Sequence, residues 1–271
     1  LAVCTWIQAG YWKDSFSLFN RALAVTSGNY IMHNNLGNVF YRDGRLDEAV
    51  VQFRKSLAIA PDHYESNNNL GNVLSDQGKL DEAVHYYRRA IQFADRDAAV
   101  SYNMAGTFFA QGKLDQAAEY YLRFLQSEPD NIKAHYHLAV VLCSQRKLDE
   151  AIIHYRRVLA AEPENMQALN NLGGVLQLKG DLGGAQDCYN KALYVDPDSS
   201  QVNYNLGVVL QSQNRFRDAQ DHLLRSIRSD PNSADAHYYL GLVLGPQGDI
   251  DGALRSFRRV LELKPDHLQA L

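Results

Sequence analysis

The stretch NNLGN occupies residues 34–38 and returns unchanged at residues 68–72, and NNLGG stands at residues 170–174. The Leu-Gly pair in this stretch belongs to a series that recurs every 34 residues, with Met or Ala in some copies. The leading residues of the series are Leu36, Leu70, Met104, Leu138, Leu172, Leu206 and Leu240. Self-similarity at a fixed period indicates a repeat architecture in which each repeat is one small structural unit.

Three further positions recur with the same period. Thirteen residues after each leading residue stands an alanine: Ala49, Ala83, Ala117, Ala151, Ala185, Ala219 and Ala253. Four residues later comes a large side chain: Phe53, Tyr87, Tyr121, Tyr155, Tyr189, Leu223 and Phe257. Near the end of the unit most copies carry proline: Pro61, Pro129, Pro163, Pro197, Pro231 and Pro265. Small residues let two helices approach closely, the large side chain fills the space between them, and proline stops the second helix, so each unit is predicted to be a helical hairpin.

The connection inside the unit reads DGRLDEA at residues 43–49 and QGKLDEA at residues 77–83. Its glycine stands where a left-handed residue ends the first helix, at Gly44, Gly78 and Gly112. Its aspartate is predicted to cap or to charge the start of the second helix, at Asp47, Asp81, Asp115 and Asp149. In the last unit Pro246 replaces a helical residue, so we expect that first helix to end about a turn early or to bend.

Together these positions resemble the tetratricopeptide repeat, a pair of antiparallel helices per 34 residues. The resemblance implies an all-α fold, a right-handed superhelical solenoid of antiparallel helix pairs. Seven units are expected, at residues 30–63, 64–97, 98–131, 132–165, 166–199, 200–233 and 234–267. Residues 1–29 are expected to be an incomplete repeat, mainly its second helix, and residues 268–271 the start of a truncated one, as in a fragment of a longer array. The opening TWIQAGYWKDSFSLFNRALAVT, residues 5–26, also resembles the start of the repeat tail in transmembrane O-mannosyltransferase-like proteins.

Composition excludes several functions. A formal net charge of −4 and a pI near 6.1 give no general attraction to nucleic acid or acidic membranes. Cys4, Cys143 and Cys188 lie far apart, which fits neither a disulfide framework nor a zinc site. No apolar run is long enough to insert into a membrane, and no nucleotide-binding, nucleophile-elbow or zinc-protease motif is present. We therefore expect no enzyme activity, cofactor, metal site or nucleic-acid partner, and the compartment stays open.

The predicted function is binding of a protein or an extended peptide. At about 100° per residue, positions 2, 5, 6, 9, 12 and 13 of each unit lie on one side of the first helix. The resemblance implies that this side faces a concave groove. The candidate groove residues are Asn34, Asn35, Asn38, Asn68, Asn69, Asn72, Tyr102, Asn103, Phe109, Lys133, Tyr136, His137, Asn170, Asn171, Tyr204, Asn205, Tyr238 and Tyr239.

Asparagine recurs at position 6, and two interpretations of this column stay open. An amide donates and accepts, so a ladder of amides can hold the backbone of an extended peptide. The groove of O-GlcNAc transferase is similar in this respect, which implies the binding mode for the asparagines in register: Asn35, Asn69, Asn103, Asn171 and Asn205. Alternatively, the amides bond to the neighbouring first helix and stabilise the contact between repeats. In that case the array is a structural spacer or associates with itself through its end repeats.

A third possibility resembles the carboxylate clamp of co-chaperones with this repeat. Asn72, Asn103 and Lys133 match that pattern. Asn68 and His137 replace its first lysine and its arginine, which leaves one certain cation and puts capture of an acidic C-terminus in doubt.

The column also changes character along the chain. The first two repeats present amides, whereas the third and fourth present Tyr102, Phe109 and Tyr136. We therefore expect a peptide to anchor an apolar side chain near these three residues, and Tyr136 to matter more for binding than Asn34.

Overall fold

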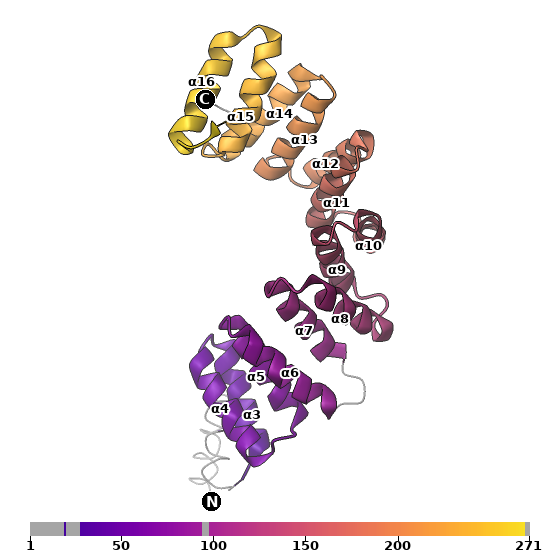
Figure 1. Ribbon diagram of the computed structural model, residues 1–271, viewed down its shortest axis with the longest axis vertical. Helices are drawn as coiled ribbons and strands as arrows, with labels where there is room; N and C mark the ends of the chain where they lie inside the picture. Colours follow the sequence, from indigo (N-terminus) through magenta and orange to yellow (C-terminus); the bar gives the residue numbers. More distant parts are fainter. Residues whose placement is uncertain (1–18, 20–27, 94–97, 269–271) are drawn as a thin grey trace, which may run out of the picture. The chain divides into compact units, whose positions relative to one another are not determined.

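The computed structural model describes residue 19 and residues 28–93 and 98–268 (Figure 1). In these residues the chain forms α-helices joined by short turns, with one 3₁₀ turn and no strand. The first helices of the pairs are α3 (Tyr30–Arg42), α5 (Tyr64–Asp76), α7 (Ala98–Ala110), α9 (Ile132–Ser144), α11 (Met166–Leu178), α13 (Ser200–Ser212) and α15 (Ala234–Leu244). The second helices are α4 (Leu46–Ile59), α6 (Leu80–Gln92), α8 (Leu114–Ser127), α10 (Leu148–Ala161), α12 (Leu182–Val195), α14 (Phe216–Ser229) and α16 (Ile250–Leu263). The predicted fold class, an all-α array of helix pairs, is confirmed.

The chain divides into two compact units, residues 1–134 and 135–271. In the first unit α3 packs on α4, α5 on α6 and α7 on α8, and in the second unit α11 packs on α12, α13 on α14 and α15 on α16. Second helices also pack on the next first helix, as α4 does on α5 and α14 on α15. The predictions for Cys4, for residues 1–27 apart from residue 19 and for residues 269–271 lie outside the described residues.

At the glycine of the repeat the first helix leaves no room for a side chain. A Cβ on Gly71 would lie 2.5 Å from Cε1 of Tyr87, and one on Gly173 would lie 2.6 Å from Cε1 of Tyr189. Both tyrosine rings are almost fully buried, so a side chain at either glycine would force the ring and its packed neighbours to move. The aromatic ring therefore occupies the space that a side chain at the glycine would need, as the sequence predicts.

The turn between paired helices requires a left-handed residue. Gly44, Gly78 and Gly112 have φ of 74°, 75° and 72°, as predicted. Arg146 and Asn214 take the same place in two other repeats with φ of 62° and 59°, although they carry a Cβ. These two repeats thus keep the left-handed turn without glycine, and the Cβ of the residue there raises the local backbone energy.

The aspartates after this turn do not cap the second helices. The N-cap residues of α4, α6 and α10 are basic and make no side-chain cap hydrogen bond: Arg45, Lys79 and Lys147. The aspartates stand in the first helical turn, where their charge is favourable, and their carboxylates reach the next repeat. Asp47 accepts a hydrogen bond from Gln77 Nε2 at 2.9 Å, and Asp81 accepts one from Gln111 Nε2 at 2.9 Å. Of the two predicted roles, charging the helix start is the one these aspartates fill.

Pro246 ends the last first helix early, as predicted. The helix α15 has 11 residues where the other first helices have 13, and the chain continues as a 3₁₀ turn at Gly245–Gln247. The shortening is two residues rather than a full turn, because a 3₁₀ turn accepts proline near its start.

Candidate peptide-binding groove

The amides of the column pair between neighbouring repeats. In the first unit the side-chain nitrogen of Asn69 donates to Oδ1 of Asn34 at 3.1 Å, and that of Asn103 donates to Oδ1 of Asn68 at 3.3 Å. Donor and acceptor lie 35 residues apart in each case. The position-6 amide of one repeat therefore bonds to the position-5 side chain of the repeat before it.

The second unit follows the same rule with one change of residue. Asn171 donates to the hydroxyl of Tyr136 at 3.1 Å, and Asn205 donates to Oδ1 of Asn170 at 2.9 Å. One repeat further on, tyrosines replace both amides, and the rings of Tyr204 and Tyr239 meet edge to face with centroids 5.7 Å apart. A phenol or a ring contact thus replaces an amide without breaking the contact between repeats.

These bonds use only part of the hydrogen-bonding capacity of the amides. Asn69 and Asn103 are half-buried, and within the described residues each makes one side-chain hydrogen bond, through its nitrogen. Each keeps an oxygen that can accept, and Asn68 keeps a nitrogen that can donate. Asn34 differs, since it is only 6% exposed and its oxygen also accepts a hydrogen bond from Ser66 Oγ. It belongs to the contact between repeats more than to a ligand surface.

The remaining amides of the first two repeats have different surroundings. Asn72 accepts a hydrogen bond from the hydroxyl of Tyr87 at 2.8 Å, so its oxygen serves the helix pair. Asn35 and Asn38 are half-buried and have no side-chain hydrogen bond with the described residues. Next to the column, Tyr41 donates to Asp76 Oδ2 at 2.6 Å, and burial followed by this bond raises the pKa of Tyr41 to about 12. The amides of these two repeats are therefore neutral polar groups, and charged groups such as Asp76 lie beside them.

The predicted anchor residues fall in both units. In the first unit Tyr102 packs on Tyr121 and Phe124, with ring centroids 5.5 and 5.2 Å away, and Phe109 is 37% exposed. In the second unit Tyr136 packs edge to face on Tyr155, with centroids 6.0 Å apart. Each unit thus contributes aromatic side chains to the predicted anchor. That these side chains bind the same residue of a peptide stays a prediction.

The residues of the carboxylate clamp are likewise divided. Asn72, Asn103 and the exposed Lys133 lie in the first unit, and the half-buried His137 lies in the second.

In the last repeat Tyr238 packs on Phe257 and on His267, with ring centroids 5.9 and 5.0 Å away. Its half-buried ring extends the aromatic part of the column to the final helix pair.

Sequence reasoning missed a second set of polar pairs, which lies between the two helices of one repeat. His135 Nδ1 lies 2.9 Å from His154 Nδ1, and the rings stack with centroids 5.1 Å apart. The corresponding positions in the sixth repeat hold Asn203 and His222, also 2.9 Å apart. Burial lowers the pKa of both His154 and His222, and the neighbouring His135 lowers that of His154 further. A polar residue at position 4 together with one at position 23 is the sequence signal that could have revealed these pairs.

No metal or thiol chemistry is organised in the described residues. They contain no group of three or more histidine, cysteine, aspartate or glutamate side chains that could hold a metal ion. Cys188 is buried and Cys143 half-buried, and burial raises the pKa of both thiols. Across residues 28–93 and 98–268 there is also no helix with the length and apolar character to cross a membrane.

Two family profiles, both described as tetratricopeptide repeat, match the sequence. One matches residues 28–96 and 164–232, and the other matches residues 68–132, 102–163 and 204–267. The chain belongs to the tetratricopeptide repeat family. A comparison with curated proteins gave no match.

Solved structures show the same fold at low sequence identity. The C-terminal part of a repeat protein from Cytophaga hutchinsonii is 12% identical with a TM-score of 0.73, and the match covers 86% of this chain and 96% of that one. A tetratricopeptide repeat protein from Parabacteroides merdae is 16% identical with a TM-score of 0.66, covering 89% and 95%. YrrB, described as a repeat protein with an unusual peptide-binding site, is 22% identical with a TM-score of 0.58, covering 68% and 95%.

Proposed function

We propose that this chain binds an extended peptide segment of a partner protein along the amide column of its first helices. The family provides interaction scaffolds that are generally not catalytic. YrrB has the same fold and a peptide-binding site by its description, which supports the same class of ligand. O-GlcNAc transferase, whose groove the column resembles, suggests the same use of the amides.

The spare capacity of the amides carries this proposal. Because the inter-repeat bonds hold Asn69 and Asn103 by their nitrogens, their oxygens keep a defined direction. An extended peptide offers an N–H donor and a carbonyl acceptor at regular intervals, so it can use these oxygens and the nitrogen of Asn68 without needing a particular side chain. The structural and the ligand-binding roles of the amides are compatible on this arrangement.

A display selection followed by calorimetry tests the proposal. Peptides selected on the intact chain are titrated into the double variant Asn69→Ala/Asn103→Ala and into a control, Gln126→Ala, which removes an exposed amide of α8 outside the column. Loss of two positioned amides should weaken binding about tenfold or more. Circular dichroism confirms that the helices persist. Selected peptides that bind both variants equally would place their site elsewhere.

Variants of Tyr136 distinguish an effect of its ring on peptide binding from an effect of its hydrogen bond with Asn171. Tyr136→Phe removes the hydroxyl that accepts from Asn171 but keeps the ring, and Tyr136→Ala removes both. If the ring anchors an apolar side chain of the peptide, the alanine variant should lose about 1–3 kcal/mol of binding free energy and the phenylalanine variant much less. Equal losses in the two variants would assign the effect to the hydrogen bond.

A further inference from the structure

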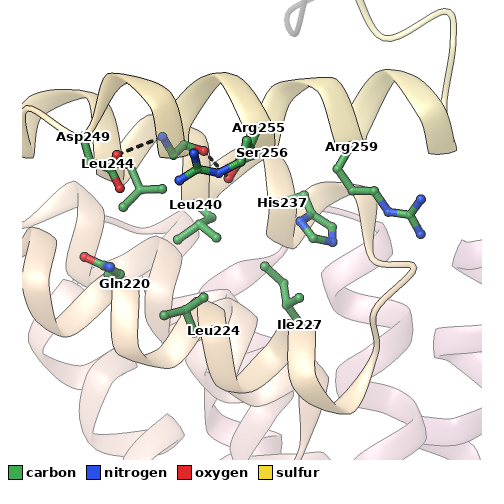
Figure 2. Close-up of a pocket in the computed structure, with 11 residues that line it drawn as sticks. Gln220, Leu224, Ile227, His237, Leu240, Leu244, Asp249, Arg255, Ser256 and Arg259 are labelled. Carbon is green, nitrogen blue, oxygen red and sulfur yellow. Dashed lines mark hydrogen bonds between the residues drawn. The ribbon is translucent and has the colours of Figure 1, made fainter.

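A hollow of about 360 Å³ lies between α14 and α16, with α15 as its floor. Figure 2 shows Leu224, Ile227 and Leu240 pointing toward the same space. Leu240 and Leu244 are each 6% exposed and form the bottom, while Leu224 is 40% exposed at the edge. The hollow therefore offers an open apolar surface rather than a closed cavity.

Cations border this apolar surface. Arg255 and Arg259 project from α16 at its edge (Figure 2). Arg259 is already engaged, since it pairs with Glu262 at 2.9 Å and donates to Asn232 at 3.2 Å. Arg255 is exposed and has no ion pair or side-chain hydrogen bond with the described residues. The one acid of the hollow, Asp249, caps α16 by accepting from the backbone nitrogen of Gly252 at 2.8 Å.

The preceding repeat has a hollow at the same place, of about 300 Å³, with opposite chemistry. There Asn190 occupies the position equivalent to Leu224, and Asp221 occupies the position equivalent to Arg255. In that hollow Arg215 pairs with Asp218 at 2.6 Å and donates to Gln186 at 3.2 Å, whereas Asp221 and Arg225 have no ion pair or side-chain hydrogen bond with the described residues. The hollow of the last repeat thus differs from that of its neighbour by a more apolar lining and by an arginine, Arg255, where the neighbour has the acidic Asp221.

We propose that the hollow of the last repeat binds a short segment of a partner protein that carries leucine or phenylalanine beside acidic residues. The apolar side chain lies on Leu240 and Leu244, and an adjacent carboxylate pairs with the guanidinium of Arg255. Charge complementarity selects the acidic neighbour, because an apolar hollow alone would not discriminate. A planar guanidinium can hold a carboxylate through two parallel hydrogen bonds.

This site is separate from the amide column. His237, Leu240 and Leu244 occupy positions 4, 7 and 11 of α15, which face the second helices, whereas Tyr238 and Tyr239 occupy positions 5 and 6. The hollow and the column therefore use different faces of the same helix, and the inference does not depend on the function proposed for the column.

Fluorescence anisotropy with labelled heptapeptides tests the proposal. The probes are Gly-Ser-Asp-Phe-Glu-Ser-Gly and its leucine counterpart, with matched peptides in which asparagine and glutamine replace the acids or serine replaces the apolar residue. The variants Leu224→Asn and Arg255→Asp place in the hollow the residues that the preceding repeat carries there. Leu122→Asn is the control, because Leu122 is 49% exposed at the same helix position of the third repeat.

The expected result is at least tenfold tighter binding of the acidic apolar probes than of either matched set. That preference should be lost in both hollow variants and kept in Leu122→Asn and in Asn69→Ala. The proposal is overturned if the acidic probes bind no better than their amide counterparts, or if Asn69→Ala abolishes binding while the hollow variants do not. It is also overturned if sedimentation shows that a second copy of the chain occupies the hollow, with self-association that Arg255→Asp removes.

Discussion

Replacing Gly173 by alanine should destabilise the α11–α12 pair, whereas the same change at the adjacent Gly174 should stabilise it. A Cβ at Gly173 would lie 2.6 Å from Cε1 and 2.9 Å from Cζ of the fully buried Tyr189. Overpacking of this kind costs about 1–3 kcal/mol. At Gly174 the nearest atom is the Tyr189 hydroxyl at 3.8 Å, which is an ordinary contact.

Both substitutions gain about 1 kcal/mol of helix propensity, so the difference between the two variants isolates the contact with Tyr189. We expect that difference to be about 1–3 kcal/mol, with Gly174→Ala above the wild type. Urea denaturation followed by circular dichroism measures it, and hydrogen exchange localises the effect to α11 and α12, because a long repeat array need not unfold in one step. Equal stabilisation by both variants would show that the helices separate freely, which would refute the reasoning.

Two further predictions concern stability. The stacked pair His135–His154 needs one ring to donate and the other to accept, and the lowered pKa of His154 favours its neutral form. The pair's contribution to folding stability is present above about pH 6.5 and is lost as the pH falls below that value. The urea midpoint should therefore drop between pH 7 and pH 5, and it should drop less in His154→Gln. If the midpoint of that variant drops as much as that of the wild type, this pair is not the cause. Asp181 caps α12 by accepting from Gly184 N at 2.9 Å, so Asp181→Ala should cost about 1 kcal/mol and speed hydrogen exchange at Gly184; unaltered exchange would contradict this role.

The sequence predicts those features that depend on residues within one repeat. Gly78 in the turn and Gly71 against Tyr87 follow from local geometry and a fixed spacing, and the structure has both. The same reasoning predicts the effect of Pro246 on α15, because a missing N–H acts on its own helix.

The partners of the column amides depend on how neighbouring repeats stack, which a helical wheel does not contain. Whether Asn69 faces solvent or Asn34 is decided by a contact across 35 residues, so both interpretations were open at the level of sequence. The hollow of the last repeat is harder still to predict. It needs Leu224 and Arg255, on different helices, to be compared with their counterparts one repeat earlier.

The inter-repeat hydrogen bonds also bear on how the array would respond to a pulling force. Each of them joins one repeat to the next only, as Asn69 joins Asn34 and Asn205 joins Asn170. A load applied along the chain would therefore act on the contacts between repeats one after another, with these hydrogen bonds as part of each contact, and the weakest contact would yield first. Each helix pair released adds roughly 110–120 Å of extended chain for a 34-residue repeat. Force–extension curves should then show evenly spaced steps, because the array lengthens by one unfolded repeat at a time.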